Sequence, residues 1–350
     1  MIKALTLTFG SFFLAAVLVT GGAYWMYDNV QEQPLQLEQE EVLLVAAGDT
    51  PRAVLNRLEQ QGIIRGAVWM RSKWRLQHEV PTLQVGEYSM VPGMKLSDLL
   101  EKWRTGDIIQ HRITLVEGWN FARLRQALAQ NEVLEHLTGD WSGEKLMEEL
   151  GYKGVHPEGR FYPDTYQFTR GQSDLDVLRQ ASQRLHDVLA EEWQQRADNL
   201  PYDTPEQALV MASIIEKETG MASERAAISG VFVRRLNRNM LLQTDPTVIY
   251  GMGDNYKGRI TRADLQRPTP YNTYTNAGLP PTPIAMVGRA AIHAALHPAE
   301  GDALYFVAKG DGSHQFSRTL QEHNRAVREY QLKRRADYRS SPAPAVQQED

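Results

Sequence analysis

The sequence predicts an α+β protein that combines an N-terminal transmembrane helix, a small α/β module and a larger mixed α/β domain. Three observations lead to this prediction. An uncharged apolar stretch covers residues 4–27, strand–turn–helix units recur in the first half, and helices, loops and short strands alternate in the second half. We therefore expect these parts in order: a transmembrane anchor over 1–27, a linker over 28–40, the α/β module over 41–155, the mixed domain over 156–338 and a disordered tail over 339–350.

Composition limits the classes of function. Hydrophobic residues make up 42% and charged residues 23% of the 350 residues, which is ordinary for a chain that buries a core. The formal net charge of −5 gives no basic signal, so no nucleic-acid partner is expected. The absence of cysteine excludes a disulfide scaffold and a cysteine-ligated zinc site.

The N-terminal stretch is long enough to cross a bilayer, because about 20 apolar residues span the hydrocarbon core as a helix. Lys3 precedes the uncharged residues 4–27, Asp28 follows them, and aromatic residues gather at 24–27. A positive flank stays in the cytoplasm, and aromatic side chains prefer the membrane interface. We therefore expect a single-pass protein of the inner membrane with a cytoplasmic N-terminus and an exported remainder. A signal peptide cut near residues 21–23 is the alternative.

Three strand–turn–helix units follow the polar linker. Each joins a short apolar strand, a turn glycine and an amphipathic helix, and the strands end at 45–48, 90–93 and 115–118. The turn Gly48-Asp49-Thr50 makes the first two units resemble a LysM domain, a module that binds glycans containing N-acetylglucosamine. A plain β–turn–α unit with an Asp/Thr helix cap explains the same residues equally well.

The second half carries clearer signals for single elements. The pattern over 175–199 is helical, residues 304–307 favour a buried strand, and Gly310-Asp311-Gly312 favours a hairpin turn. A further helix is predicted over 204–220, with Thr204 as its N-cap, Gln207 completing a capping box and Gly220 as its stop. Because its middle is almost entirely apolar, this helix should be mostly buried.

Two glutamates lie at the end of that predicted helix. At 3.6 residues per turn, Glu218 falls between the directions of Met211 and Ile214, whereas Glu216 has smaller neighbours. Apolar neighbours and the negative end of the helix dipole both disfavour a carboxylate, so we expect a raised pKa for Glu218. A carboxyl group that stays protonated near neutral pH can serve as a general acid in glycosidic cleavage. Alternatively, both glutamates only form ion pairs with arginines such as Arg225.

Several segments spread along the chain form a specific combination. They are Ser213-Ile-Ile-Glu-Lys-Glu-Thr219, EGRFYPDTY at 158–166, TDPTVIYG at 244–251, YNTY at 271–274, GLPP at 278–281 and EHN at 322–324. Together with the apolar N-terminus and the LysM-like region, they resemble the YceG-like family, the endolytic murein transglycosylases, over nearly the whole chain. Thr282, where a glycine is expected, and residues 285–288 depart from the family pattern.

The resemblance implies a reaction and a place for it. Glu218 matches the acid/base residue of a lytic transglycosylase, a carbon–oxygen lyase that cuts the bond from N-acetylmuramic acid to N-acetylglucosamine in peptidoglycan. Glu218 would protonate the linking oxygen and then take the proton of the C6 hydroxyl, which closes on C1 to give a 1,6-anhydro end. Intramolecular attack needs no second carboxylate. The resemblance also implies a periplasmic catalytic domain that terminates or releases nascent strands, with peptidoglycan synthases as membrane partners.

Two other functions remain open. A muramidase would use water instead of the C6 hydroxyl, with Asp164, Asp245 or Glu322 as a second carboxylate. A scaffold would bind glycan and recruit synthases without cutting.

Further residues are candidates for holding the substrate. Tyr271, Asn272, Thr273 and Tyr274 place aromatic faces beside amide and hydroxyl groups, which suits a sugar, although a turn packed on the core is the alternative. We expect Gln315 and Asn324 to be polar groups that orient an N-acetyl substituent.

A metal or other cofactor is not expected. His293 and His297 stand four residues apart on one predicted helix face, which is a possible spacing for a metal pair. They lack the glutamate of an H-E-x-x-H motif, and a proline follows at once.

Overall fold

The computed structural model describes residues 17–332. Its contacts divide the chain into two compact units. The first unit runs up to His111 and includes Val133–Glu135 and Gln167–Gln172, and the second unit holds the rest. The predicted boundary between residues 155 and 156 falls inside the second unit and stays a prediction. The predicted tail over 339–350 lies outside the described residues.

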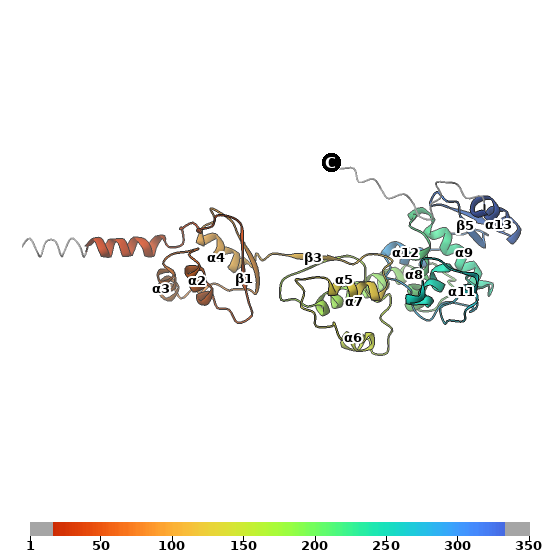
Figure 1. The fold of residues 1–350 in the computed structure, drawn as a ribbon, viewed down its shortest axis with the longest axis horizontal. Helices are drawn as coiled ribbons and strands as arrows, with labels where there is room; N and C mark the ends of the chain where they lie inside the picture. The colour runs from red at the N-terminus through yellow and green to blue at the C-terminus, as the bar shows by residue number, and fades with distance from the viewer. Residues whose placement is uncertain (1–16, 333–350) are drawn as a thin grey trace, which may run out of the picture. The chain divides into compact units, whose positions relative to one another are not determined.

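The first unit has an antiparallel pair of strands with two helices between them in sequence (Figure 1). A helix over residues 17–29 precedes them, and the elements are β1 (Glu41–Val45), α2 (Pro51–Gln60), α3 (Ala67–Gln77), β2 (Gly86–Met90) and α4 (Leu96–Thr105). In the register of this pair, Leu43 lies opposite Tyr88. Residues directly opposite each other in a pair of strands face the same side, and both of these side chains are buried.

The predicted strand–turn–helix units are confirmed as local structure. β1 leads into α2 and β2 into α4, while β3 (His111–Thr114) leads into α5 (Phe121–Ala129). Thr50 caps α2, because its hydroxyl accepts the backbone N–H of Ala53 at 3.2 Å. Gly48 has a φ of 89°, a left-handed value that favours glycine in this turn. The resemblance of this region to a LysM domain stays a prediction.

The predicted anchor is described only in part, because residues 1–16 lie outside the described range. Residues 17–29 are helical, and Leu18, Val19 and Trp25 in this helix are 68%, 71% and 66% exposed. Within residues 17–332, no helix combines the length and the apolar character that crossing a bilayer requires. The transmembrane helix of the predicted fold therefore gains no support from the described residues.

The second unit is mainly helical, with short strands. Besides α5, its helices are α6 (Gly143–Glu149), α7 (Asp174–Gln194), α8 (Pro205–Glu218), α9 (Arg225–Asn237), α10 (Asp245–Met252), α11 (Arg262–Gln266), α12 (Arg289–Leu296) and α13 (Leu320–Val327). β4 (Thr165–Phe168) pairs with β3, and β5 (Tyr305–Ala308) pairs antiparallel with β6 (His314–Ser317). The mixed α/β class is thus confirmed, and α7 confirms a helix in the region predicted over 175–199, although it ends at Gln194.

α8 is the central helix of the second unit. It packs against α7, α9, α10 and α12, and residues 208–215 are all buried, as their apolar character predicts. The hydroxyl of Thr204 accepts the backbone N–H of Gln207 at 3.3 Å, as predicted. The side chain of Gln207 accepts the backbone N–H of Asp203 at 2.7 Å, one residue earlier than a capping box requires. The helix ends at Glu218 rather than at Gly220.

Two polar side chains of α8 hold the segment 284–288. The hydroxyl oxygen of Ser213 accepts the backbone N–H of Ile284 at 3.0 Å, and a carboxylate oxygen of Glu216 accepts the backbone N–H of Gly288 at 3.1 Å. Buried polar atoms need such partners to offset lost hydration. The segment is therefore fixed to the same helix that carries Glu218.

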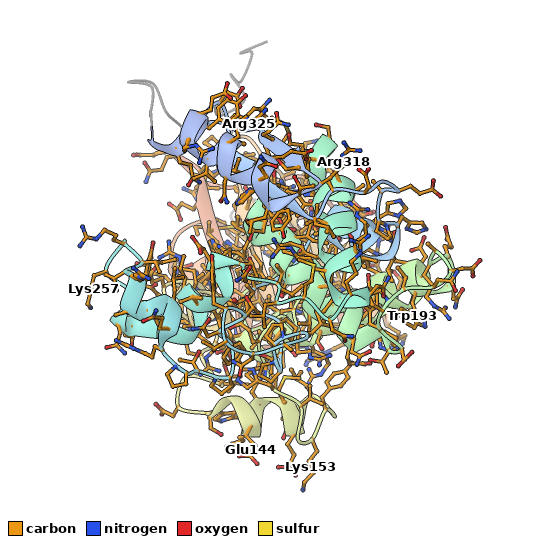
Figure 2. The ribbon with its side chains drawn as sticks, turned by 90° about the vertical axis from the view of Figure 1, so that its right-hand side faces the viewer. Glu144, Lys153, Trp193, Lys257, Arg318 and Arg325 are labelled. Carbon is orange, nitrogen blue, oxygen red and sulfur yellow. The ribbon has the colours of Figure 1, made fainter. Side chains whose placement is uncertain are left out.

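The C-terminal hairpin lies within one residue of its predicted position, but of the β5 residues only Val307 is buried, so the prediction of a buried strand is only partly correct. β5 begins at Tyr305, and in the connection to β6 the glycines Gly310 and Gly312 have φ values of 92° and 90°. Charged side chains such as Lys153, Lys257 and Arg325 are exposed and point outward from the ribbon (Figure 2).

Candidate active site

Glu218, the last residue of α8, keeps a small accessible surface while its carboxyl group is surrounded by protein. Burial raises the pKa of Glu218 to about 7. The negative charge of Asp245 adds to the rise, whereas the hydroxyl of Thr244 and the charge of Arg235 oppose it. The predicted direction is confirmed, and burial is its main cause. This carboxyl group can therefore carry a proton near neutral pH.

The hydroxyl of Thr244 donates a hydrogen bond to Oε1 of Glu218. Thr244 is itself fixed, because its backbone N–H donates to the hydroxyl of Thr273 at 3.1 Å. Oε1 is thus held in place, and Oε2 makes no hydrogen bond within residues 17–332.

The two glutamates of α8 differ in their partners. Glu216 forms an ion pair with Arg225 at 3.6 Å, so the ion-pair alternative is correct for this residue. Burial raises the pKa of Glu216 as well, but the N–H of Gly288 and the charge of Arg225 oppose the rise. Among the described residues, Glu218 has no ion pair of this kind. Only Glu218 therefore combines a raised pKa with an unengaged oxygen.

Arg235 and Tyr274 complete the surroundings of Glu218. The guanidinium of Arg235 donates to the backbone oxygens of Leu304 at 2.7 Å and Leu242 at 2.9 Å. The hydroxyl of Tyr274 donates to Oδ1 of Asp245 at 2.6 Å, and burial raises the pKa of Tyr274. Both groups are thus fixed beside the carboxyl group.

The predicted substrate residues 271–274 divide into two kinds. Asn272 is 1% exposed, and its amide nitrogen donates to the backbone oxygen of Arg267 at 2.7 Å while its amide oxygen accepts the N–H of Tyr274 at 2.9 Å. Thr273 is 2% exposed and contacts the hydroxyl of Thr247 at 2.9 Å. For these two residues the structure favours the alternative, a turn packed on the core. Tyr271 and Tyr274 keep accessible surface, and their contact with substrate stays a prediction.

Gln315 and Asn324 lie on β6 and α13, and both are exposed. The side-chain nitrogen of Gln315 donates to the backbone oxygen of Phe316 at 3.0 Å. Neither residue lines the large cleft described next. Their role in orienting an N-acetyl group stays a prediction.

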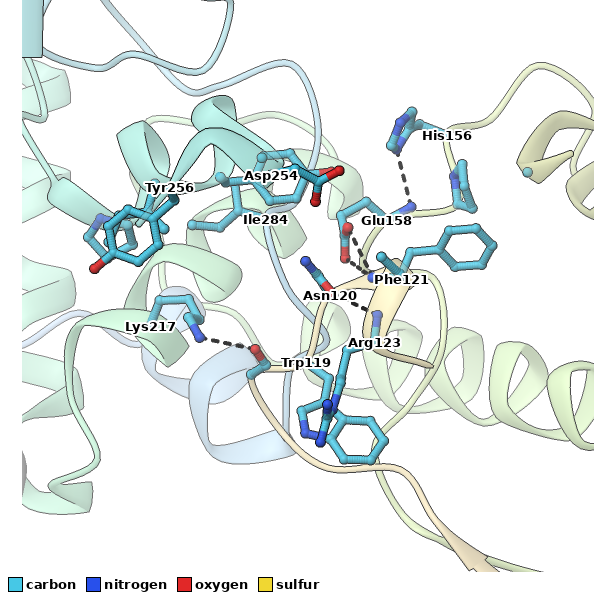
Figure 3. A pocket seen from close by; sticks show the side chains of 18 of the residues that line it. Trp119, Asn120, Phe121, Arg123, His156, Glu158, Lys217, Asp254, Tyr256 and Ile284 are labelled. Atoms are coloured by element: carbon cyan, nitrogen blue, oxygen red, sulfur yellow. Dashed lines mark hydrogen bonds between the residues drawn. The ribbon is translucent and has the colours of Figure 1, made fainter. Parts of the chain in front are cut away.

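A cleft of about 1210 Å³ lies beside the end of α8 (Figure 3). Its volume exceeds that of most small-ligand sites, as an extended polymer would require. Lys217 and Pro246, the chain neighbours of Glu218 and Asp245, line the cleft, although the two acidic residues themselves do not. The remaining wall comes from the start of α5, the loop before residue 159 and the end of α10, and includes Trp119, Phe121, Arg123, His156, Glu158, Tyr250, Asp254 and Tyr256.

The wall at the start of α5 is joined to the core. The backbone oxygen of Met286 accepts the N–H of Gly118 at 2.9 Å, and the N–H of Met286 donates to the backbone oxygen of Trp119 at 2.7 Å. The ammonium of Lys217 donates to the backbone oxygen of Gly118 at 3.1 Å. The guanidinium of Arg123 lies 5.5 Å from the centre of the Trp119 ring, which favours a cation–π contact.

Glu158 is a buried carboxyl group in this cleft for which the sequence indicated no separate role. It is 3% exposed, and the N–H of Phe121 donates to its two oxygens at 3.0 and 3.1 Å. Burial raises the pKa of Glu158, while the N–H of Phe121 and the hydroxyl of Tyr250 oppose the rise. Phe121 is the first residue of α5, so Glu158 joins the positive end of this helix to the loop across the cleft. The only signal in the sequence was its place in the segment 158–166.

One group of described residues has donor atoms close enough for a metal ion, namely Glu192, His293 and His297, whose ligand atoms lie within 4.8 Å of one another. Nδ1 of His293 is engaged with Glu192 at 2.8 Å, and Nε2 of His297 lies 2.8 Å from the backbone oxygen of Gln195. The two rings stack at 4.1 Å, so their lone pairs lie in separate planes and do not converge on one ion. This arrangement gives no reason to expect a bound metal.

Comparison with known proteins places the chain among enzymes of one kind. A relative from Bacillus subtilis described as an endolytic murein transglycosylase is 31% identical over 337 residues, which cover 89% of this chain and 91% of the relative. A relative of the same description from Streptococcus pneumoniae is 25% identical, and the match covers 91% of this chain but 64% of that longer protein.

Solved structures and family patterns agree with these relatives. A crystal structure of a YceG-like protein from Listeria monocytogenes aligns with a TM-score of 0.50 and 28% identity, covering 83% of this chain and 99% of that chain. The pattern of the YceG-like family matches residues 43–329, which is most of the length and includes Glu218 and the cleft. The chain therefore belongs to the YceG-like family.

Proposed function

We propose that this protein is a lytic transglycosylase that cuts peptidoglycan glycan strands internally, with Glu218 as its acid/base residue. The main observation is a carboxyl group with a pKa raised to about 7 and one oxygen held by Thr244. The description of the Bacillus subtilis relative, which aligns over nearly its whole length, supports the same reaction.

The arrangement suits a reaction with a single carboxyl group. In its protonated form, Glu218 donates to the oxygen that links N-acetylmuramic acid to N-acetylglucosamine, and the bond breaks through an oxocarbenium-like state. The resulting carboxylate takes the proton of the C6 hydroxyl of the same muramic acid. That hydroxyl attacks C1 and leaves a 1,6-anhydro end, so no water molecule is consumed. Attack within one sugar has a high effective molarity.

The cleft beside α8 is the proposed place of the glycan. Trp119 and Tyr256 offer aromatic faces for sugar rings, and Lys217 and Arg123 offer donors for hydroxyl and amide oxygens. Lys217 and Pro246, which adjoin Glu218 and Asp245 in the sequence, line this cleft. A strand lying in the cleft would present a linking oxygen near these residues.

The three candidates for a second carboxylate, Asp164, Asp245 and Glu322, support a muramidase less well than Glu218 supports the lytic reaction. Oδ1 of Asp164 accepts the N–H of Thr165 at 2.7 Å, and Glu322 caps α13 by accepting the N–H of Thr319 at 3.3 Å. Asp245 is close enough to raise the pKa of Glu218, and it accepts the hydroxyl of Tyr274. Asp245 is thus the one candidate for activating water, and product analysis decides the matter.

The deciding experiment is digestion of purified sacculi followed by mass spectrometry. Wild-type protein should release fragments with 1,6-anhydro ends, and Glu218→Gln should lower the rate by about 10³-fold or more, since a general acid contributes about 10²–10⁴-fold and also serves as the base here. Glu216→Gln is a matched control on the same helix, because its carboxyl group serves an ion pair with Arg225. Reducing ends would contradict the lytic reaction, and full activity of Glu218→Gln would leave only a glycan-binding scaffold.

The N-terminal residues indicate where the protein is located. The uncharged residues 4–27 and the exposed apolar side chains of residues 17–29 support an inner-membrane anchor, with the second unit in the periplasm near peptidoglycan synthases. Carbonate extraction of membranes tests the anchor, since a spanning segment resists extraction. Release of the full-length protein by carbonate would contradict it.

A further inference from the structure

A second cavity of about 500 Å³ is lined by other residues than Glu218, Thr244 and Asp245. The start of α8, Leu236 of α9 and the proline-rich segment 277–283 contribute to its lining. Most of the residues that line it are apolar, but Arg160, Glu206 and Gln207 add polar surface.

Arg160 is unusual in this cavity because its guanidinium has no hydrogen bond or ion pair within residues 17–332. Its Nε atom is buried without a partner. Burial lowers the pKa of Arg160, and the charge of Glu206 only partly opposes this. Glu206 is exposed, and its charge acts on Arg160 without a hydrogen bond between the two side chains. Buried polar atoms normally have a hydrogen-bond partner, so the Nε–H of Arg160 is available to a ligand in this cavity.

The same two chain segments serve both cavities. In the first segment, Glu158 lines the large cleft and Arg160 lines the second cavity. In the other segment, Ile284 lines the large cleft and Pro283 lines the second cavity. Gly159 packs directly against Pro283, so the two cavities lie on either side of this contact, and a side branch that passes over it would reach the second cavity.

We propose that Arg160 binds the carboxylate of a short peptide branch attached to the glycan, and this inference depends on the proposed function for the identity of the glycan. The planar guanidinium offers two parallel donors that match a carboxylate. The apolar walls formed by Val210, Leu236 and the prolines suit small apolar residues such as alanine. Glu206 at the rim repels a dianion more strongly than a single carboxylate, which favours a peptide over a phosphate.

Gln207 gives the site a second donor. Its side-chain oxygen is occupied by the N–H of Asp203 at 2.7 Å, and this contact fixes the orientation of the amide. The amide nitrogen has no hydrogen-bond partner within residues 17–332. A peptide carbonyl beside the bound carboxylate could accept from it.

The test measures binding of N-acetyl-D-alanyl-D-alanine and of the same peptide with a C-terminal amide, by titration followed by NMR. Full-length Glu218→Gln protein is used, so that cutting cannot affect the result. The acid should bind at least tenfold more tightly than the amide. Arg160→Gln should weaken binding of the acid at least tenfold, Arg160→Lys should weaken it less, and Arg259→Gln, at an exposed arginine, should leave it unchanged.

The outcomes separate this inference from the proposed function. Equal affinity for acid and amide, no binding of either, or unchanged binding by Arg160→Gln would each overturn the peptide site. Binding of inorganic phosphate without binding of the peptide would overturn it as well. Thermal unfolding shows whether Arg160→Gln folds, and removal of an unpaired charge should not lower its stability. Loss of cutting by Glu218→Gln, measured separately on sacculi, bears only on the proposed function.

Discussion

Replacing Thr244 by valine tests the electrostatics of the site most directly. The side chain of Thr244 is 1% exposed, and valine has nearly the same shape, so the packing should survive. The hydroxyl is not needed to cap α10, because no side-chain cap bond forms there. The substitution therefore removes one donor from Oε1 of Glu218 and little else.

The expected shift follows from the charge-assisted hydrogen bond. Such a bond stabilises the charged form by about 1.5–3 kcal/mol, and one pKa unit corresponds to about 1.4 kcal/mol. Its loss should raise the pKa of Glu218 from about 7 by about one to two units. Since the protonated form starts the reaction, the alkaline limb of the rate against pH should move upward by the same amount.

The assay is kcat/KM for a soluble glycan substrate between mildly acidic and alkaline pH. Thr244→Ser is the matched control, because it keeps the hydroxyl, and its alkaline limb should coincide with that of the wild type. The height of the plateau is not the readout, since a less well-oriented carboxyl group also lowers the maximal rate. An alkaline limb that stays in place or moves downward in Thr244→Val would refute the assignment of this limb to Glu218.

Three further results are expected. The pKa of Glu218 is raised from 4.5 to about 7, so its contribution to stability is fully present below pH 4.5 and is lost as the pH rises through 7. Glu218→Gln does not lose this contribution, so it should be more stable than wild type by up to about 3 kcal/mol at pH 8 and equally stable at pH 4. Urea unfolding at the two pH values measures this difference. Asn272→Leu should lower the free energy of unfolding by about 2–4 kcal/mol, because buried backbone groups lose their partners, whereas Asn324→Leu at an exposed position should change it little. Trp119→Ala should raise KM about tenfold with a nearly unchanged melting temperature, since stacking on an aromatic ring contributes about 1–1.5 kcal/mol; an unchanged KM would place the glycan elsewhere.

Local features of the chain were predictable from the sequence. The start of α8 follows from Thr204 and Pro205, which act within one helical turn, and its burial follows from an apolar run. The direction of the pKa shift of Glu218 followed from the same run. These features depend on neighbours a few residues apart, which the sequence displays directly.

Contacts between distant segments were not predictable in the same way. The donor that fixes Glu218 is Thr244, 26 residues away, and nothing in the local pattern around either residue indicates the pairing. The segment 271–274 has the composition of a sugar site, but Asn272 turns its amide inward to the backbone of residues 264–267. The choice between solvent and backbone as a partner depends on tertiary packing, which a single sequence does not specify.

The bonds from Ser213 and Glu216 to the segment 284–288, together with the pairing of Met286 with Gly118 and Trp119, have a mechanical consequence. Glu218 and the wall of the cleft at the start of α5 therefore belong to one rigid part of the second unit, so neither can move without the other. Because the N–H of Phe121 also holds Glu158, the loop before Gly159 is joined to the same part of the structure, and any widening that admits a bulky polymer is left to the residues after α10, which include Asp254 and Tyr256. Motion of those residues would let a glycan strand enter the cleft while the carboxyl group of Glu218 keeps its position.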